Sequence, residues 1–266
     1  MEIIDCHVHI CPDALAGRNK EIIQRFSGIT PAYDGSVGLL LSMMHENKIS
    51  KAIVNNTVLK AELMSKANDF TADVVSKHSE LFGMAWIIPG IPESVEEVER
   101  CKRLGFKGVK MHNSHFKVMP TDSRNDRIYE KIVEHSLPVL FHCGFNPYSA
   151  SGDRQYATPR NFQGVIKSYP EMKVILGHLA GYQDDPKGAI ETVNASDNVF
   201  ADLALDPRRQ TNFDQIMGEF GSRKLMFGSD YPIHEAGSAL HAISQLDAND
   251  SAAIYSLNSK SLFSLP

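Results

Sequence analysis

Short apolar runs alternate along this chain with longer stretches in which apolar residues recur every three or four positions. The first pattern predicts buried strands, and the second predicts helices that bury one face. The apolar runs, each expected to form a strand, are 3–10, 51–55, 81–88, 106–112, 138–142, 172–178, 198–204 and 224–230. The helical stretches are 36–48, 62–78, 94–104, 123–135, 158–169, 187–195, 213–220, 237–246 and 252–263.

The helix at 94–104 has the clearest end signals. Ser94 and Glu97 have the spacing of a capping box, in which the first residue caps the helix and the residue three positions later bonds back to it. Gly105 follows the last turn, where glycine often ends a helix. The sequence therefore predicts that Ser94 caps this helix.

The order of these elements predicts an α/β fold, a (β/α)8 TIM barrel. Eight strands that are apolar on both faces, each followed by a helix, suit a parallel sheet covered by helices. No linker rich in glycine, serine and proline divides the chain, and its composition does not shift along its length. One barrel domain is therefore expected over residues 1–266.

Most of the predicted strands end in a side chain that can bind a metal ion or move a proton. These residues are His7, His9, Lys110, His112, His142, His178, Asp202 and Asp230. Barrel active sites lie at the carboxyl ends of the strands, so we expect these side chains to share one rim.

Strand alternation predicts which of these side chains point the same way. His7 and His9 are two residues apart, so both rings should face one metal ion. Lys110 and His112 should likewise share a face, and His142 should share one with Leu140. By the same rule, Cys6 and Cys143 should point to the opposite face and serve as packing residues.

Composition narrows the partners. The net charge is −5 with no block of lysine and arginine, which argues against nucleic acid. The longest apolar run, 37–44, is too short to span a membrane, and no leader pattern opens the chain, so a cytoplasmic protein is expected. Its four cysteines are expected to be reduced. The expected partner is a small-molecule substrate, and a homodimer is left open.

The motifs at the strand ends, in this order, resemble those of the amidohydrolase superfamily. They are similar in particular to the amidohydrolase-related group that includes aminocarboxymuconate semialdehyde decarboxylase and sugar lactonases. The residues that carry the resemblance are Asp5, His7 and His9; Gly108, Lys110 and His112; Pro138 and His142; Gly177, His178 and Gly181; and Gly228, Asp230 and Pro232. The resemblance implies a TIM barrel of the metal-dependent hydrolase type, with a divalent metal, usually zinc, held by His7, His9, His142 and Asp230.

The chemistry of these residues agrees with that assignment. Three imidazoles and a carboxylate suit zinc, with manganese as an alternative, and one ion per chain is expected. A bound divalent ion lowers the pKa of its water to about 7, and Asp230 can accept a proton from that water. His178 is expected to act as the general acid or base on the substrate.

Lys110 has three possible states, because an ammonium beside a divalent ion is unfavourable. It can be neutral, it can be carbamylated and bridge two metals, or it can face a substrate carboxylate. A single metal with a non-bridging Lys110 is favoured here.

The substrate is expected to meet Lys110, His112, Tyr148 and Arg154. The last two lie in a long loop, 144–157, that can form a pocket wall. Arg208 and Arg209 are further candidates for a substrate carboxylate. His115 and His234 follow two of the strands, so they either contact the pocket or lie on the surface. Asp202 either orients a ligand histidine or makes a polar contact on the helix side of its strand.

Hydrolysis is the predicted reaction, with activated water attacking an amide, lactone or ester carbonyl. The alternative is non-oxidative decarboxylation of a small aromatic or enoic acid. A barrel that binds without turnover is disfavoured by the complete ligand set. A DNase is disfavoured because Lys110 occupies a position where a carboxylate would be needed.

Overall fold

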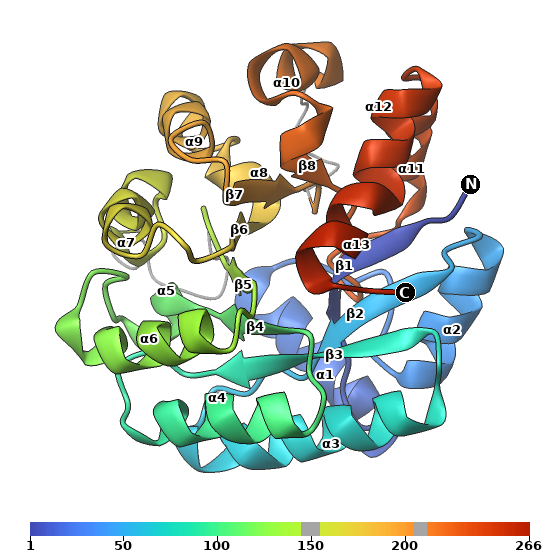
Figure 1. The fold of residues 1–266 in the computed structure, drawn as a ribbon. Coiled ribbons are helices and arrows are strands. Elements are labelled where there is room, and N and C mark those ends of the chain that lie inside the picture. The colour runs from blue at the N-terminus through green and yellow to red at the C-terminus, as the bar shows by residue number, and fades with distance from the viewer. Residues whose placement is uncertain (145–154, 205–211) are drawn as a thin grey trace.

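The computed structural model describes residues 1–144, 155–204 and 212–266 and contains eight parallel strands (Figure 1). The strands are β1 (Ile4–His9), β2 (Lys51–Asn55), β3 (Leu81–Ile87), β4 (Gly108–Met111), β5 (Val139–Phe141), β6 (Val174–Leu176), β7 (Val199–Asp202) and β8 (Leu225–Met226). Each strand pairs with the next along the chain. The predicted (β/α)8 barrel is confirmed.

The barrel closes between β1 and the segment that follows β8. Cys6 N donates to Phe227 O at 3.0 Å, Asp230 N to His7 O at 2.9 Å, and His9 N to Tyr231 O at 2.7 Å. These bonds replace the ladder that two full strands would form. They bring Asp230 beside His7 at the carboxyl end of β1.

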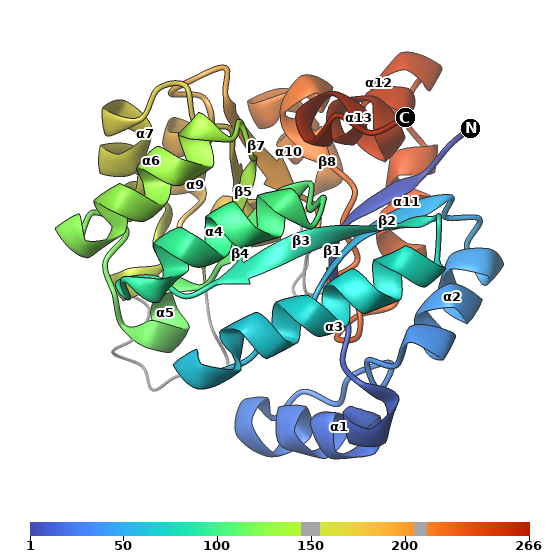
Figure 2. The ribbon, with the colours of Figure 1, turned by 60° about the horizontal axis from the view of Figure 1, so that its bottom comes forward.

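Helices surround the strands (Figure 2). They are α1 (Asp13–Ser27), α2 (Val37–Glu46), α3 (Met64–Lys77), α4 (Glu93–Arg103), α5 (Asn113–Phe116), α6 (Asp126–Glu134), α7 (Gln163–Ser168), the short turn α8 (Gly177–Gly181), α9 (Pro186–Val193), α10 (Phe213–Phe220), α11 (Gly237–Ser244), α12 (Ala248–Ala252) and α13 (Asn258–Phe263). Short 3-10 turns are η1 (Ala61–Leu63), η2 (Ser123–Asn125), η4 (Pro159–Phe162) and η5 (Ser222–Lys224), and the π-helical turn η6 (Ala253–Leu257) joins α12 to α13. Within the described residues, no helix is both long enough and apolar enough to span a membrane.

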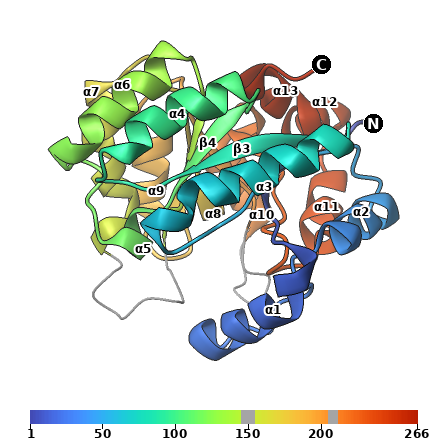
Figure 3. The same ribbon diagram turned by 90° about the horizontal axis from the view of Figure 1, so that it is seen from below.

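Helix α1 was not predicted. Its apolar residues are too sparse to mark a buried face, and those buried in its described part are Ala16 and Ile23. Leu15 and Ile22 remain exposed. Figure 3 shows α1 at the periphery of the molecule, away from the strands.

A small cluster of apolar side chains fills the barrel below the rim. Its buried members are Cys6, Ile53, Met84, Leu140, Ile175, Met226, Leu262 and Phe263. Phe263 of α13 closes the lower end, where a side chain at Gly108 would come within 2.8 Å of its ring. A larger cluster, which includes Val109, Met111, Val139 and Phe141, lies between strands and helices. The predicted facing of β4 and β5 is therefore confirmed.

The expected facing of Cys6 was wrong. The pairing of β1 with β2 shifts between Asp5 and Val8, so Cys6 and His7 together stand opposite one residue, Ile53. This bulge breaks the alternation of a regular strand. Cys6 consequently packs inside the barrel, while Cys143 lies in the outer cluster as expected.

The capping box at Ser94 was also wrong. Helix α4 begins at Glu93, and its N-cap residue Pro92 makes no capping hydrogen bond through a side chain. Ser94 Oγ instead donates to Ile88 O at 2.6 Å. Glu97 accepts hydrogen bonds from residues of α3, so a tertiary network has replaced the local motif.

Candidate metal centre

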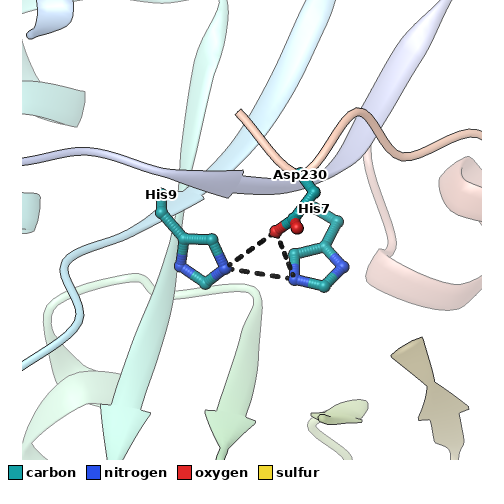
Figure 4. A group of neighbouring side chains, drawn as sticks. All are labelled: His7, His9 and Asp230. Carbon is teal, nitrogen blue, oxygen red and sulfur yellow. Dashed lines mark hydrogen bonds and ion pairs between the residues drawn. The ribbon is translucent and has the colours of Figure 1, made fainter. Parts of the chain in front are cut away.

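His7, His9 and Asp230 converge at the rim of the barrel (Figure 4). Their ligand atoms all lie within 4.8 Å of one another. Nε2 of His7 is 3.1 Å from Nε2 of His9, and Oδ1 of Asp230 lies 3.6 Å and 3.5 Å from these two nitrogens. Two imidazole nitrogens and a carboxylate oxygen aimed at one point form a donor set for a divalent metal such as zinc or manganese.

The opposite ring nitrogens are held by hydrogen-bond partners, as in many protein metal sites. Nδ1 of His7 lies 2.8 Å from Asp202 Oδ2. Nδ1 of His9 lies 2.9 Å from Asn55 Oδ1 and 3.0 Å from Thr57 Oγ1. Such partners fix the ring orientation and leave Nε2 for the ion. The residues present therefore fit the metal that the donor set implies.

Asp230 stays ionised in this surrounding. Burial alone would raise the pKa of its carboxyl, but the hydrogen bond from His9 and the neighbouring His178 outweigh burial and hold the pKa well below its usual range. Its backbone is left-handed, with φ +58°, and its amide is bonded to His7 O. The carboxylate is thus available as a metal ligand.

Lys110 lies directly against this group. Its Nζ is 2.8 Å from Nε2 of His7, the same nitrogen that faces His9 and Asp230. Burial lowers the pKa of Lys110 to about 8, although Asp202 and Asp230 oppose the shift. Burial and the charge of Lys110 also hold the pKa of His7 well below its usual range. His7 is therefore neutral, as a metal ligand must be.

His178 stands on an unusual backbone. His178, Leu179 and Ala180 have φ angles of +56°, +51° and +55°, a left-handed turn directly after β6. Such conformations cost roughly 1–2 kcal/mol per residue, so the surrounding structure must impose them. His178 N donates to Asp202 Oδ1 at 2.8 Å, and its Nδ1 lies 2.7 Å from Ala204 O. The sequence predicted a continuous strand up to His178, but β6 ends at Leu176.

His142 is hydrogen-bonded to His178, whose ring centroid lies 5.1 Å from that of His7, and is not among the three ligands that converge. Its Nδ1 is 3.0 Å from Nε2 of His178, and its buried Nε2 has no hydrogen-bond partner among the described residues. Burial and the nearby charges of His178 and Lys110 lower the pKa of His142 well below its usual range. The role of His142 as the fourth metal ligand therefore stays a prediction.

Three imidazoles stack beside the centre. The rings of His112 and His142 are 3.9 Å apart and nearly parallel at 10°, and those of His112 and His115 are 3.6 Å apart at 25°. Burial lowers the pKa of His115 to about 4, with the charges of His9 and Lys110 adding to the effect. His115 packs in this wall through its ring contact with His112, although it is half-buried, and His234 is half-buried as well.

Four of the residues expected to meet a substrate lie outside the described part of the chain: Tyr148, Arg154, Arg208 and Arg209. Two contacts of the site were not predicted from the sequence. Asn55 and Thr57, which hold His9, were missed. The signal for Asn55 was present, since it is a polar residue at the end of a predicted strand, like the ligands themselves.

Comparison with known proteins agrees with this site and fold. A sequence model of the family described as amidohydrolase matches residues 4–265. The chain belongs to the amidohydrolase family, as its motifs indicated. No curated protein sequence matches it.

Solved structures share the fold at low sequence identity. An uncharacterized TIM-barrel protein of Bordetella bronchiseptica is 18% identical with a TM-score of 0.80, over 99% of both chains. The 5-carboxyvanillate decarboxylase of Sphingomonas paucimobilis is 15% identical with a TM-score of 0.74, over 100% of this chain and 99% of the other. That of Novosphingobium aromaticivorans, complexed with manganese and 4-hydroxy-3-methoxy-5-nitrobenzoic acid, is 18% identical with a TM-score of 0.74, over 99% and 96%.

Proposed function

We propose that this protein is a metal-dependent decarboxylase of a small aromatic or enoic carboxylic acid. The observation that carries the proposal is the excess of nitrogen groups over carboxylates around the centre. The nitrogen groups are His7, His9, His112, His142, His178 and Lys110, set against the carboxylates Asp202 and Asp230. Asp202 is already engaged by His7 and by two backbone amides.

This surplus of nitrogen groups suits an anionic substrate and a reaction that accumulates negative charge. A carboxylate entering the site would meet Lys110 and several imidazoles. Decarboxylation leaves an electron pair on the substrate carbon, so preorganised proton donors and cations stabilise its transition state. Hydrolysis needs an activated water instead, and it requires fewer such groups.

The residues have separable roles in this reaction. A divalent ion held by His7, His9 and Asp230 would bind substrate oxygens and withdraw negative charge. The bond between the substrate carbon and its carboxylate breaks, and the electron pair stays on the carbon. His178, whose Nδ1 is held by Ala204 O and whose Nε2 lies 3.0 Å from His142 Nδ1, gives that carbon its proton through Nε2. One carboxylate and one proton yield one C–H bond and carbon dioxide.

The structural neighbours support this reading, although their likeness extends only to the fold. Two of them are decarboxylases of a substituted benzoate, and one binds manganese. We expect one divalent ion per chain here, zinc or manganese, because the ligand atoms of His7, His9 and Asp230 converge on one point at the rim.

Hydrolysis of an amide, lactone or ester is the second candidate. The observation that favours it is the position of Asp230, since a carboxylate within 3.6 Å of the two histidine nitrogens could accept a proton from a water held at the same point. In that case the nitrogen groups would polarise a carbonyl oxygen.

Isotope labels separate the two reactions. The protein loaded with zinc or manganese is incubated with panels of benzoic and enoic acids, lactones and N-acyl compounds, in D2O and separately in ¹⁸O-water. Decarboxylation predicts one carbon dioxide per turnover and one deuterium on the product carbon. One ¹⁸O in a product acid, without carbon dioxide, would instead establish hydrolysis. The matched His178→Asn variant should be inactive on the same substrate.

A further inference from the structure

Asp202 contacts two parts of the centre at once. It ends β7 and is fully buried. Through Oδ2 it lies 2.8 Å from Nδ1 of His7. Through Oδ1 it accepts hydrogen bonds from His178 N at 2.8 Å and from Ala204 N at 3.1 Å. One carboxylate oxygen therefore contacts His7 of β1, and the other contacts the turn that follows β6.

Two glycines make room for this arrangement. A side chain at Gly228 would place its Cβ 2.9 Å from His7 Cβ and 3.4 Å from Asp202 Cβ. A side chain at Gly177 would lie 3.4 Å from His7 Cε1 and 3.5 Å from Asp202 Oδ2. The His7–Asp202 pair is thus packed between the residues that follow β6 and β8, with little freedom to move.

We propose that Asp202 is a positioning residue that aligns the metal ligand His7 and the left-handed turn of His178 together. Its carboxylate accepts a hydrogen bond from the protonated Nδ1 of His7. The lone pair of Nε2 is then directed at His9 and Asp230. Its other oxygen holds the His178 amide, which keeps three consecutive residues left-handed. One side chain then sets the distance between the metal and the proton donor. The inference rests on the proposed function in taking His7 as a metal ligand.

The variant Asp202→Asn separates the orientation of the His7 ring from the hydrogen bond to the His178 amide. The amide oxygen can still accept from His178 N and Ala204 N, but its NH2 group must donate to Nδ1 of His7. The ring then carries its proton on Nε2, the nitrogen that the metal needs. We expect manganese or zinc affinity, measured by competition with a chelator, to fall by about 10–100-fold. The ¹⁵N spectrum of His7 in the metal-free protein should move its proton from Nδ1 to Nε2.

The variant Asp202→Ala removes both tasks. Amide hydrogen exchange at His178 and Ala204 should accelerate in this variant and stay slow in Asp202→Asn. Glu97→Gln is the matched control, because it is also a carboxylate-to-amide change in a buried network but lies outside the barrel. It should change neither metal affinity nor the His7 spectrum. If Asp202→Ala fails to fold, Asp202→Asn still decides the role at His7.

Unchanged metal affinity and an unchanged His7 spectrum in Asp202→Asn would overturn the inference, and so would slow exchange at His178 in a folded Asp202→Ala. A wild-type protein that binds no metal would instead contradict the proposed function. In that case the ¹⁵N and exchange measurements would still decide the role of Asp202.

Discussion

His142 and His178 share a hydrogen bond, yet the structure holds them in different ways. His178 is fixed through its amide and its Nδ1, on a turn that follows β6. His142 follows β5, with a buried Nε2 that has no hydrogen-bond partner among the described residues. His142 can therefore complete the metal ligand set, while His178 can act on a substrate.

Substitution of each histidine tests this division. His142→Ala should lose most of the metal affinity of the protein, because it removes a ligand. His178→Asn should keep the metal and lose turnover by about 10²–10⁴-fold. Asparagine also tolerates the left-handed backbone at this position. Metal content by elemental analysis and turnover are measured together, and equal loss of metal in both variants would show that His178 is a ligand.

The close approach at Gly228 gives a second test at the residue scale. Gly228→Ala would push a methyl group to within 2.9 Å of His7 Cβ, so His7 must shift and metal affinity should fall. Gly218→Ala is the matched control. A Cβ at Gly218, within α10, meets no heavy atom within 4 Å among the described residues, so this change should stabilise the protein by about 0.5–1 kcal/mol. Equal metal affinity in the two variants would contradict the packing argument.

At the scale of the elements, a network of side chains from α3 and α4 holds the outer side of β3. The pairing of β2 with β3 ends at Gly83, which leaves the backbone of Trp86 without a partner on that side. Asn68 of α3 takes the place of a strand there: Trp86 N donates to Asn68 Oδ1 at 2.8 Å, and Asn68 Nδ2 donates to Trp86 O at 3.1 Å. Asn68 also donates to Glu97 of α4 at 2.7 Å. The network thereby ties α3 and α4 to β3, which pairs with the strand that carries Lys110.

Glu97 should make this network pH-dependent. Burial alone would raise the pKa of its carboxyl, but hydrogen bonds from Arg100, Asn68 and Ser65 outweigh burial and hold the pKa at about 2, below the ordinary 4.5. A lowered pKa means that the stabilisation is complete above pH 4.5 and is lost as the pH falls towards 2. Glu97→Gln should reduce the free energy of unfolding by about 1–3 kcal/mol at pH 7.

Urea unfolding at pH 7 and at pH 3 checks this expectation. The difference between wild type and Glu97→Gln should shrink at the lower pH. The exposed Glu134→Gln should show a small difference at both values. A difference for Glu97→Gln that does not change with pH would mean that Glu97 acts through shape rather than charge.

These elements also show what the sequence could and could not predict. The strand order and the rim position of His7, His9, Lys110 and Asp230 followed from periodicity, because burial imposes a regular pattern on both faces. The bulge that turns Cys6 inward and the left-handed turn at His178 did not, because contacts with distant residues impose them. The partners of Asp202, Asn68 and Glu97 include residues 18 to 195 positions away, beyond any local pattern.

At the scale of the whole molecule, closure of the barrel brings the first strand, β1, beside the segment that follows the last strand, β8. Asp230, which follows β8, meets His7 and His9 of β1 only because the barrel closes between these strands. Metal binding should therefore depend on closure as well as on the ligands. The central claim is that one divalent ion joins the first and last strands at this point.

Anomalous diffraction from crystals grown with zinc or manganese tests that claim most directly. The account predicts one main peak per chain, about 2.0–2.2 Å from Nε2 of His7, Nε2 of His9 and a carboxylate oxygen of Asp230. A bond from that peak to His142 would establish the fourth ligand. The absence of any peak bonded to His7, His9 and Asp230 would contradict the account.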